Sequence, residues 1–248
     1  MRTLIIGKNS FICSKFKNLT NSKIISYKKL NKFDFSKFNK VLLLSMPKNY
    51  KKKISKISFE KNLFKKIRNK RLVYISTSQV YPNKLNNREK ILKPQSIYGK
   101  NKLKIENEIK KNFKDYLILR APIIFQKSNY SKQSFFDILN RNFKKNKIFF
   151  DISEKSIRDL ITLDDFYKCY LKIDKIKLKG TFNIGTKKGL TVKKIVNYYF
   201  YKKKMNKKIK ISYGKKISNM TLNVERLENK IQKFSNKLYK NAIEELKK

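Results

Sequence analysis

Six short apolar runs recur along the chain, and stretches with helical spacing separate them. The runs are mainly β-branched or aliphatic, and their apolar residues follow one another without alternating with polar ones. Strands that are apolar on both faces are typical of parallel sheets, in which helices cover each face. The runs are Thr3–Ile6, Ile24–Ser26, Val41–Leu44, Leu72–Ile75, Tyr116–Leu119 and Thr181–Ile184.

Helical stripes lie between these runs, with apolar residues spaced by three and four positions so that one face of each helix is buried. Thr191 precedes the last stripe and is placed as its N-cap. Strands that alternate with helices predict a doubly wound α/β fold. The segment from Tyr201 to Lys216 is too rich in lysine for a helix or a strand to be assigned. The stripes consist of Ile12, Phe16 and Leu19, of Ile105, Ile109 and Phe113, and of Val192, Ile195, Val196 and Tyr199.

The charge of the chain first suggests a nucleic-acid partner. The 248 residues include 64 Lys and Arg and only 17 Asp and Glu, for a net charge of +47, and basic surfaces attract polyanions. However, the lysines are spread evenly, arginine is scarce, and Asn, Ile, Phe and Tyr are abundant throughout. This composition is typical of an AT-rich genome, so we expect a solvated basic surface and no specific nucleic-acid site.

Other classes of protein are excluded by what the sequence lacks. No apolar run approaches the ~18 residues needed to cross a bilayer, and the start has no signal-peptide pattern. Cys13 and Cys169 cannot form a disulfide framework, and a chain without histidine has no ordinary zinc site. We therefore expect a cytoplasmic protein with no membrane segment and no metal.

The first apolar run leads directly into a turn suited to a dinucleotide. Such a turn needs small residues for its tight bend, for the approach of the pyrophosphate and for contact between helix and strand. Gly7, Ser10 and Cys13 occupy the three positions of a G-x-x-G-x-x-G spacing. The turn alone fits an ordinary strand–helix connection equally well.

Tyr98 and Lys102 form the strongest chemical pair in the sequence. They are four residues apart and therefore neighbours on one face of a helix, and Ile105 and Ile109 continue that face inward. A nearby cation is expected to lower the pKa of a phenol, which can then exchange a proton with a substrate hydroxyl. A chance Y-x-x-x-K spacing is the alternative, because the chain has 14 tyrosines and many lysines.

The surrounding motifs decide between these alternatives. Together, in this order, they resemble the extended short-chain dehydrogenase/reductase family, in its branch of nucleotide-sugar epimerases, dehydratases and ketoreductases. The matching segments are Gly7-Lys8-Asn9-Ser10-Phe11-Ile12, Val73 to Tyr81, Pro94-x-Ser96-x-Tyr98-Gly99-x-x-Lys102-Leu103-x-x-Glu106, Leu119-Arg120-Ala121-Pro122, Arg158-Asp159-Leu160-Ile161-x-Leu163-Asp164-Asp165, Phe182-Asn183-Ile184-Gly185 and Leu222-Asn223-x-x-Arg226-Leu227.

The resemblance implies a role for each matching residue. Thr77 would orient the substrate oxygen beside Tyr98, and Lys102 would complete the catalytic set. The cofactor-binding residues would be Gly7, Ser10, Phe11, Ile12, Lys28, Asp34, Phe35, Asn62, Tyr98 and Lys102, and the substrate-binding residues would be Ser78, Gln79 and Arg158.

Structural alternatives stand beside several of these roles. Thr77 could instead be a strand-end residue that caps a loop. Arg158 could instead form a surface salt bridge with Asp159 or Asp164. For Asp34-Phe35 and for Asn62, the alternatives are an ordinary loop and an ordinary helix surface.

The resemblance also implies a domain organisation. A Rossmann-like doubly wound parallel sheet is expected in residues 1–122 and 158–185. A small, mostly C-terminal substrate lobe is expected in residues 123–157 and 186–248. A nucleotide sugar, used for precursors of cell-surface polysaccharides, would be the substrate, and a homodimer is left open.

Departures from the family pattern narrow the range of reactions and cofactors that we expect. Ser78 and Gln79 stand where dehydratases have an acid and a base, which argues against a dehydratase. The second strand ends in Ser26-Tyr27-Lys28-Lys29 with no carboxylate for a ribose hydroxyl, which favours NADP over NAD. The loss of two glycines from the phosphate turn and a shortened substrate lobe favour a 4-ketoreductase over a 4-epimerase. The alternative is a non-catalytic protein of the same fold that binds RNA or another polyanion, since aromatic residues and lysines interleave from Tyr198 to Tyr213.

Overall fold

The chain forms two compact units, and the structure, a computed structural model, describes residues 2–30, 33–44, 47–126, 135–200 and 209–248. Unit 1 comprises Met1–Pro82, Glu89–Ala121 and Cys169–Asn183, and unit 2 comprises Asn83–Arg88, Pro122–Lys168 and Ile184–Lys248. The expected domains place residues 158–168 with the sheet, whereas here they belong to unit 2. The reason is strand pairing, because β8 (Ile157–Arg158) and β9 (Leu160–Thr162) pair with other strands of unit 2.

Unit 1 is built on one sheet of six strands in the order β10-β5-β4-β3-β1-β2, and every pair in it is parallel. Each strand overlaps one of the six apolar runs, so the predicted parallel sheet is confirmed. Its strands are β1 (Thr3–Ile6), β2 (Ser22–Ile25), β3 (Lys40–Leu43), β4 (Arg71–Thr77), β5 (Tyr116–Ala121) and β10 (Gly180–Asn183).

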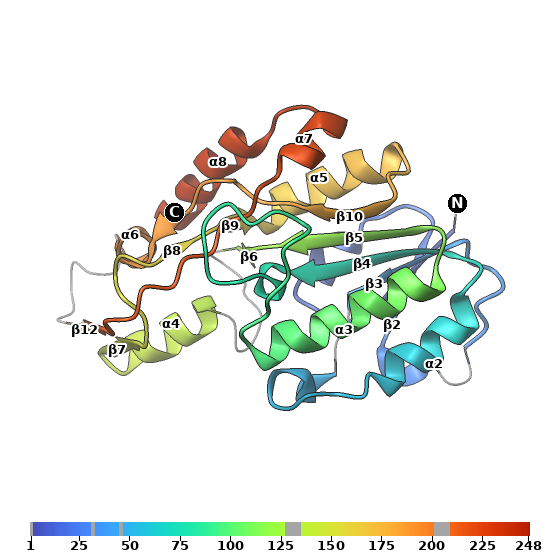
Figure 1. Cartoon of the computed structure of the whole chain (residues 1–248), viewed down its shortest axis with the longest axis horizontal. Coiled ribbons are helices and arrows are strands. Elements are labelled where there is room, and N and C mark those ends of the chain that lie inside the picture. Colours follow the sequence, from blue (N-terminus) through green and yellow to red (C-terminus); the bar gives the residue numbers. More distant parts are fainter. Residues whose placement is uncertain (1, 31–32, 45–46, 127–134, 201–208) are drawn as a thin grey trace. The chain divides into compact units, whose positions relative to one another are not determined.

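Helices cover both faces of this sheet, as a doubly wound fold requires. On one face α2 (Ser58–Ile67) and α3 (Ile97–Asn112) lie side by side (Figure 1) and bury apolar residues against β1, β3, β4 and β5. On the other face α1 (Cys13–Phe16) meets the carboxyl-terminal part of α5 (Leu163–Lys175), where the Phe16 and Tyr170 ring centroids are 4.9 Å apart. The predicted stripe through Leu19 is too long, because α1 ends at Phe16 and a turn leads into β2.

The strand order marks the edge of the sheet at which a ligand is expected. The chain passes from β1 to β2 on one side and then returns to β3 on the other side of β1. Parallel strands end at the same edge, and ligands of open α/β sheets bind where the strand order reverses in this way. The short helices η1 (Tyr27–Lys29) and η3 (Ser78–Val80) follow β2 and β4 at this edge, and η2 (Lys48–Lys51) lies in the connection between β3 and α2.

In its described residues, unit 2 has three two-stranded sheets around an aromatic core. Rings stack in the pairs Phe125–Phe136, Phe143–Phe200 and Phe150–Tyr213. Its sheets are β6 (Ile123–Phe125) with β9, β7 (Lys147–Phe150) with β12 (Lys210–Tyr213), and β8 with β11 (Leu190–Thr191). Its helices include α4 (Phe135–Lys144), α6 (Val192–Tyr199), α7 (Glu225–Ile231) and α8 (Ser235–Lys247).

Two expectations about the later part of the chain can be compared with unit 2. The Thr191 hydroxyl accepts a hydrogen bond from the Lys194 N–H at 3.2 Å, which confirms the predicted N-cap of α6. Part of the lysine-rich segment, residues 201–208, lies outside the described residues, and the rest includes β12. Across the described ranges, no helix is both long enough and apolar enough to cross a bilayer.

Candidate active site

The first turn of α3 is locked to the end of β4. Ser96 is the N-cap of α3, and its hydroxyl accepts a hydrogen bond from the Gly99 N–H at 3.0 Å while donating one to Gln79 Oε1 at 2.6 Å. A Cβ at Gly99 would lie 2.1 Å from the Gln79 carbonyl oxygen, so only glycine permits this approach. These contacts bring Tyr98, in the first turn of α3, beside the segment that follows Thr77.

Thr77 is the last residue of β4, and its side chain has a structural contact. Its hydroxyl accepts a hydrogen bond from the Gln79 N–H at 3.3 Å, and the residue is buried. This is the contact of a strand-end threonine that caps a loop. A hydroxyl that accepts one hydrogen bond still has a proton to donate, so the catalytic role of Thr77 remains a prediction. Ser78 is buried in η3, and Gln79 is exposed with its amide oxygen bound to Ser96.

Lys102 lies one helical turn after Tyr98, with its ammonium group in the interior. Its Nζ donates to the Ile75 carbonyl oxygen at 2.7 Å and lies 4.4 Å from the centroid of the Tyr74 ring and 5.8 Å from that of Tyr98. Burial lowers the pKa of Lys102 to about 8, although the Glu60 carboxylate, and after it that of Glu106, act to raise it. Lys102 is thus a fixed cation close to the tyrosine.

The pKa of Tyr98 differs in direction from the sequence-based expectation. Burial raises it to about 12, whereas the Lys102 cation was expected to lower it. The geometry explains the difference, because Lys102 Nζ binds a backbone carbonyl and lies closer to the Tyr74 ring than to that of Tyr98. The phenol is therefore protonated at neutral pH.

A buried polar network fixes α3 against the sheet. The Glu106 carboxylate accepts hydrogen bonds from the Ser76 hydroxyl at 2.5 Å and from Arg120 Nε and Nη2 at 3.0 and 2.5 Å. Arg120 Nη1 donates to the Tyr81 hydroxyl at 2.8 Å, and that hydroxyl donates to Asn183 Oδ1 at 2.6 Å. Two residues of the family motifs, Glu106 and Arg120, thus hold the helix in place rather than face a substrate.

Asn101 is a further residue of this site, and the sequence analysis missed it. Its buried amide donates to the carbonyl oxygens of Tyr50 and Lys53 at 2.9 and 2.8 Å and accepts from the Ser55 N–H at 2.8 Å. It thereby fixes the loop before α2 against α3. Asparagine has a low helix propensity, and its place beside Tyr98 and Lys102 was the signal that could have identified it.

The turn after β1 has the backbone that a dinucleotide needs but few contacts of its own. Gly7 has φ 137°, a conformation that favours glycine, and its N–H and that of Lys8 donate to the Ile25 carbonyl at 2.9 and 3.2 Å. The Ser10 N–H donates to the Gly7 carbonyl at 2.8 Å, and Ile12 precedes the four-residue α1 without a side-chain cap.

Apart from Tyr98 and Lys102 of α3, the residues expected to bind the cofactor fall into two groups. Gly7, Ser10, Phe11 and Ile12 follow β1, and the exposed Lys28 lies in η1 after β2, so all five lie at the carboxyl edge of the sheet. With Gly7 free of a side chain and Ser10 small, the residues at this edge fit a dinucleotide diphosphate.

Asp34, Phe35 and Asn62 form the second group, and their role in binding the cofactor stays a prediction. The Asp34 carboxylate accepts hydrogen bonds from the Ser36 N–H and hydroxyl at 2.8 and 2.9 Å, and Phe35 is buried in the core. Both belong to the crossover that returns the chain to the amino end of β3. Asn62 is exposed on α2. These are the contacts of a loop and of a helix surface.

Arg158, in unit 2, is held by neutral groups. Its guanidinium donates to the carbonyl oxygens of Ile157 and Ser218 and to the Ser218 hydroxyl, the last at 3.1 Å. Burial lowers its pKa. The alternative partner Asp159 instead accepts hydrogen bonds from the Thr186 N–H and hydroxyl at 3.0 and 2.6 Å. Arg158 therefore makes these contacts in place of the salt bridge with Asp159, and the Asp151 carboxylate acts to raise its pKa.

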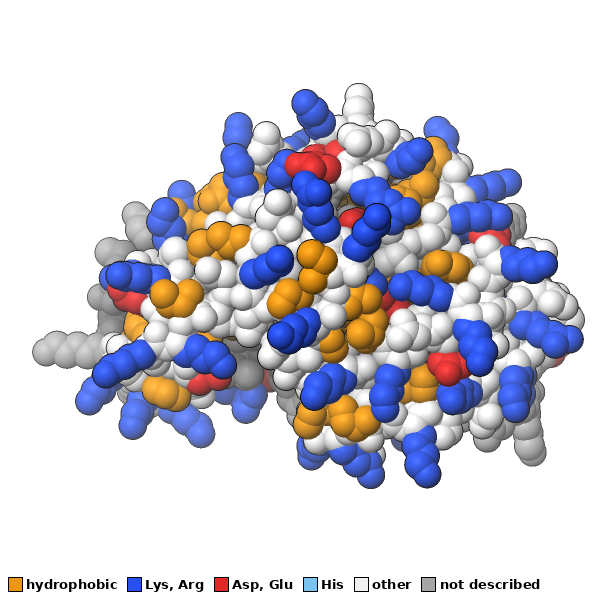
Figure 2. Space-filling view, viewed as in Figure 1, with side chains coloured by type: hydrophobic (Ala, Val, Ile, Leu, Met, Phe, Trp, Pro, Cys, Tyr) orange, Lys and Arg blue, Asp and Glu red, His pale blue; other side chains and the backbone are white. Residues whose placement is uncertain are grey.

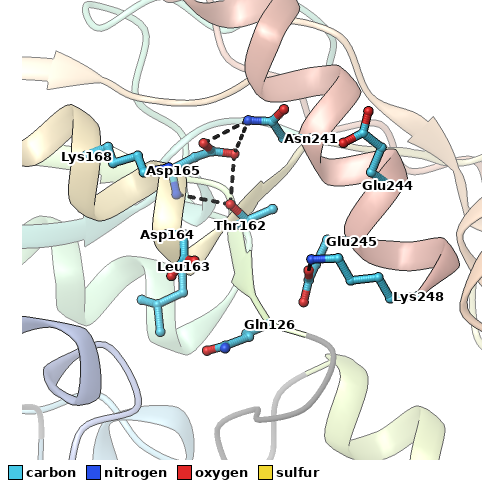
Figure 3. Close-up of a pocket in the computed structure, with 10 residues that line it drawn as sticks. All are labelled: Gln126, Thr162, Leu163, Asp164, Asp165, Lys168, Asn241, Glu244, Glu245 and Lys248. Carbon is cyan, nitrogen blue, oxygen red and sulfur yellow. Dashed lines mark hydrogen bonds and ion pairs between the residues drawn. The ribbon is translucent and has the colours of Figure 1, made fainter.

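Unit 2 also contains a polar pocket of about 590 Å³ between the start of α5 and the end of α8 (Figure 3). At its edge the Asp165 carboxylate accepts hydrogen bonds from the Thr162 hydroxyl at 2.8 Å and from Asn241 Nδ2 at 2.9 and 3.0 Å. These contacts cap α5 and join it to α8. The residues that line the pocket include none of the predicted site residues.

Lysine and arginine side chains are spread over the face of the molecule that Figure 2 shows, with acidic side chains between them. This agrees with the even distribution of lysine along the sequence. On the face shown, the charge does not mark one binding site.

Comparisons with known proteins identify the fold. The family described as RmlD substrate binding domain matches residues 64–152, and no curated protein sequence matches the chain. Similar solved structures include a dTDP-4-dehydrorhamnose reductase from Clostridium acetobutylicum, which is 19% identical, with a TM-score of 0.76 and 100% of both chains covered.

Two further solved structures belong to other reaction classes. A UDP-glucuronic acid 4-epimerase from Bacillus cereus, in complex with UDP-glucuronic acid and NAD, is 17% identical with a TM-score of 0.72, covering 100% of this chain and 99% of that one. An NAD-dependent NDP-hexosamine 5,6-dehydratase of tunicamycin biosynthesis is 13% identical with a TM-score of 0.76, covering 98% and 97%. The Rossmann-like fold is confirmed, the family match over residues 64–152 agrees with the resemblance, and nothing in these comparisons supports the polyanion-binding alternative.

Proposed function

We propose that this chain, a member of the extended short-chain dehydrogenase/reductase family by its motifs, its match over residues 64–152 and its fold, is an NAD(P)-dependent 4-ketoreductase of a nucleotide-linked sugar. The observation that carries the proposal is the arrangement at the start of α3. A protonated Tyr98 lies beside the Thr77 segment, and the buried Lys102 cation lies one turn further along the same helix.

The proposed reaction uses these residues as a proton donor and its support. The turn after β1 and Lys102 would hold the dinucleotide, which would supply a hydride for the substrate carbonyl carbon. Tyr98 donates its phenolic proton to the carbonyl oxygen as that oxygen becomes an alkoxide. The Thr77 hydroxyl orients the same oxygen by a hydrogen bond, and the Lys102 cation stabilises the phenolate that Tyr98 becomes.

The raised pKa of Tyr98 supports the direction of reduction. A phenol with a pKa of about 12 is a poor base at neutral pH, so removing a proton from a sugar hydroxyl is slow at first encounter. Donation is favourable, because an alkoxide is far more basic than a phenolate. A 4-epimerase must both remove and return that proton, whereas a ketoreductase needs only the donation, so a protonated Tyr98 agrees with a ketoreductase.

The two residues that follow Thr77, Ser78 and Gln79, argue against a dehydratase. Neither Ser78 nor Gln79 is an acid or base at neutral pH, and the Gln79 amide is engaged by Ser96. We propose that both contact the sugar and that Arg158 binds the phosphates, since its guanidinium carries a charge and its described hydrogen bonds go to neutral groups.

The choice of dinucleotide rests on the end of β2. Lys28 is exposed in η1, directly after β2, where a cation would bind a ribose 2′-phosphate. We therefore expect NADPH to protect the fold against heat more than NADH does.

Lys28→Ala should weaken NADPH binding about fivefold, roughly 1 kcal/mol, and leave NADH binding unchanged. Calorimetric titration of both cofactors measures this, and Lys17→Ala, at an exposed lysine after α1, serves as the matched control. Equal affinities for the two cofactors in the unsubstituted protein would contradict the preference.

The direct test of the reaction is a stoichiometry. Offered a nucleotide-linked 4-keto sugar, the purified protein should oxidise one NADPH per sugar reduced, followed by absorbance and by mass spectrometry of the sugar. Interconversion of two nucleotide sugars without net loss of NADPH would identify a 4-epimerase instead.

A further inference from the structure

A buried carboxylate in unit 2, that of Asp159, directly follows Arg158 in the chain and has no part in the mechanism above. The residue is 1% exposed. Its oxygens accept hydrogen bonds from the Thr186 N–H and hydroxyl at 3.0 and 2.6 Å and from the Leu222 N–H at 3.3 Å. One side chain thus joins three parts of unit 2, which are the end of β8, the loop after β10 and the segment 218–222.

The segment 218–222 lies alongside β8 and is held there by its backbone. The Met220 N–H donates to the Ile157 carbonyl, and the Asp159 N–H donates to the Met220 carbonyl, both at 2.9 Å. Met220 also forms a parallel bridge with Arg158. Two residues further on, the Leu222 N–H donates to the Asp159 carboxylate. The carboxylate therefore extends the pairing of this segment with β8 through a side chain.

The same segment carries the partners of the Arg158 guanidinium. The Ser218 carbonyl accepts a hydrogen bond from Nη1, and the Ser218 hydroxyl accepts one from Nη2 at 3.1 Å. Ser218 is itself buried, and its N–H donates to the Ser156 hydroxyl at 3.0 Å. The direction of the guanidinium therefore depends on where the segment 218–222 lies beside β8.

The loop after β10 leaves room for this carboxylate. A Cβ at Gly185 would lie 2.7 Å from Asp159 Oδ2, and the buried carboxylate cannot move away without losing its hydrogen bonds. Gly185 and Asp159 come from two different motifs of the sequence, and this contact explains why both residues are needed. The carboxylate, the glycine and the hydrogen-bond donors form one cluster next to Arg158.

We propose that Asp159 is a positioning residue of the nucleotide-sugar site, whose carboxylate fixes the segment 218–222 beside β8 so that Ser218 directs the Arg158 guanidinium toward the diphosphate. This inference rests on the proposed function, because that function supplies the diphosphate. Asp159 acts through Arg158, and no bond is made or broken at Asp159.

The protonation of Asp159 makes this role dependent on pH. Burial raises the pKa of Asp159 to about 7, although its hydrogen bonds, first that from the Thr186 hydroxyl, act to lower it. At about pH 8 the ionised carboxylate accepts all its donors, whereas at about pH 6 the carboxyl group carries a proton and accepts fewer hydrogen bonds. The charged groups on the segments around Asp159 are Arg158, on which Asp151 acts, Lys187, which pairs with Glu225, and Lys188.

The test is the affinity for UDP-glucose and dTDP-glucose, whose diphosphate stays ionised throughout this pH range, measured by calorimetry on the full chain. Asp159→Asn keeps the shape of the side chain but has one acceptor oxygen instead of two. At about pH 8 the dissociation constant should rise about tenfold, as expected for the loss of one hydrogen bond to a charged group. At about pH 6, where the carboxyl group itself is neutral, the two proteins should differ about twofold or less.

Three further variants separate this role from a structural one. Ser218→Ala removes one acceptor of the guanidinium and should raise the dissociation constant about threefold. In an Arg158→Lys background, Asp159→Asn should add less than about twofold, because lysine has no planar fork to direct. Asp165→Asn changes another buried carboxylate of unit 2, which binds Thr162 and Asn241, and should leave the affinity unchanged even where it lowers the melting temperature.

Turnover gives a second measure of the same role. With a nucleotide-linked 4-keto sugar, Asp159→Asn should raise KM by the same factor and leave kcat and the affinity for NADPH within about twofold. If Asp159→Asn does not fold, the unsubstituted protein decides the question, because its affinity should fall about fivefold from pH 8 to pH 6. An affinity that does not change over this range would then overturn the proposal.

The outcomes distinguish this inference from the proposed function. Coupled effects of Asp159→Asn and Arg158→Lys support the inference even if no sugar is reduced. If Arg158→Lys weakens binding but Asp159→Asn does not, or if their effects simply add, the inference is wrong and the proposed function stands. Binding of neither nucleotide sugar would contradict both.

Discussion

The two functional segments of unit 1, the helix α3 and the turn after β1, are held in very different ways. In α3 the N-cap Ser96, the close approach at Gly99, and the buried side chains of Asn101 and Glu106 each bind a different part of the unit. The turn after β1 is held by backbone hydrogen bonds and leads into a four-residue helix without a side-chain cap. The protein thus fixes its proposed catalytic groups more firmly than the turn proposed to bind the cofactor, so substitutions in α3 should cost more than those in the turn.

The largest effect is expected at the proton donor. Tyr98→Phe removes only the phenolic oxygen, so turnover should fall by about 10²–10⁴-fold while the dissociation constant of the dinucleotide changes little. Steady-state rates and calorimetric binding measure the two quantities on the same preparation. Tyr116→Phe, a change of the same kind at the start of β5, serves as the control and should keep its activity. A Tyr98→Phe protein with normal turnover would remove Tyr98 from the mechanism.

Stability should respond most strongly in the network that anchors α3. Arg120→Met leaves the Glu106 carboxylate buried without its cation, and the free energy of unfolding should fall by about 3–5 kcal/mol. Urea denaturation measures this loss. Arg141→Met breaks the exposed ion pair with Asp137 in α4 and should cost less than about 1 kcal/mol. Similar losses in the two variants would show that burial of the pair is not what matters.

A smaller effect is expected where α3 meets η3. In Gly99→Ala the added methyl group would overlap the Gln79 carbonyl, so the helix and the Thr77 segment must separate at a cost of about 1–3 kcal/mol. We expect kcat to fall more than cofactor affinity, because the displaced groups are the catalytic ones. The exposed neighbour Lys100→Ala is the control, and a Gly99→Ala enzyme as stable and active as that control would contradict the contact.

The smallest effect should occur in the turn after β1. Ser10→Gly removes a side chain close to the expected position of the diphosphate, and the dissociation constant of the dinucleotide should fall about threefold, on the order of 0.7 kcal/mol. The melting temperature without cofactor should not rise, because glycine adds conformational entropy to the unfolded chain. An unchanged or weaker affinity would show that Ser10 itself contributes to binding.

Apolar periodicity was sufficient to predict the sheet and α3, because these elements depend on which faces are buried. The continuous runs at Leu72–Ile75 and Tyr116–Leu119 mark the neighbouring strands β4 and β5, and Ile105 and Ile109 mark the inward face of α3. Helix length was less predictable, since α1 ends where a turn forms rather than where the apolar stripe ends.

The long-range contacts of the site could not be predicted in this way. Asn101 and Glu60 are polar residues in helices, where exposure is the usual expectation, and their burial depends on the loop that packs between them. The direction of the Tyr98 pKa likewise depends on burial, which sequence spacing does not reveal. Asp34 and Phe35 follow the family pattern, but in the structure Asp34 caps a turn through Ser36 and Phe35 packs in the core.

The most direct test of the account follows the hydride itself. NADPH deuterated at the transferable position of nicotinamide C4 is incubated with the enzyme and a nucleotide-linked 4-keto sugar. Mass spectrometry and NMR of the product should then find one deuterium at C4 of the sugar for each NADPH oxidised. With the Tyr98→Phe variant, almost no deuterated sugar should form in the same time. A reduced sugar without deuterium, or equal transfer by Tyr98→Phe, would contradict a ketoreductase that uses Tyr98 as its proton donor.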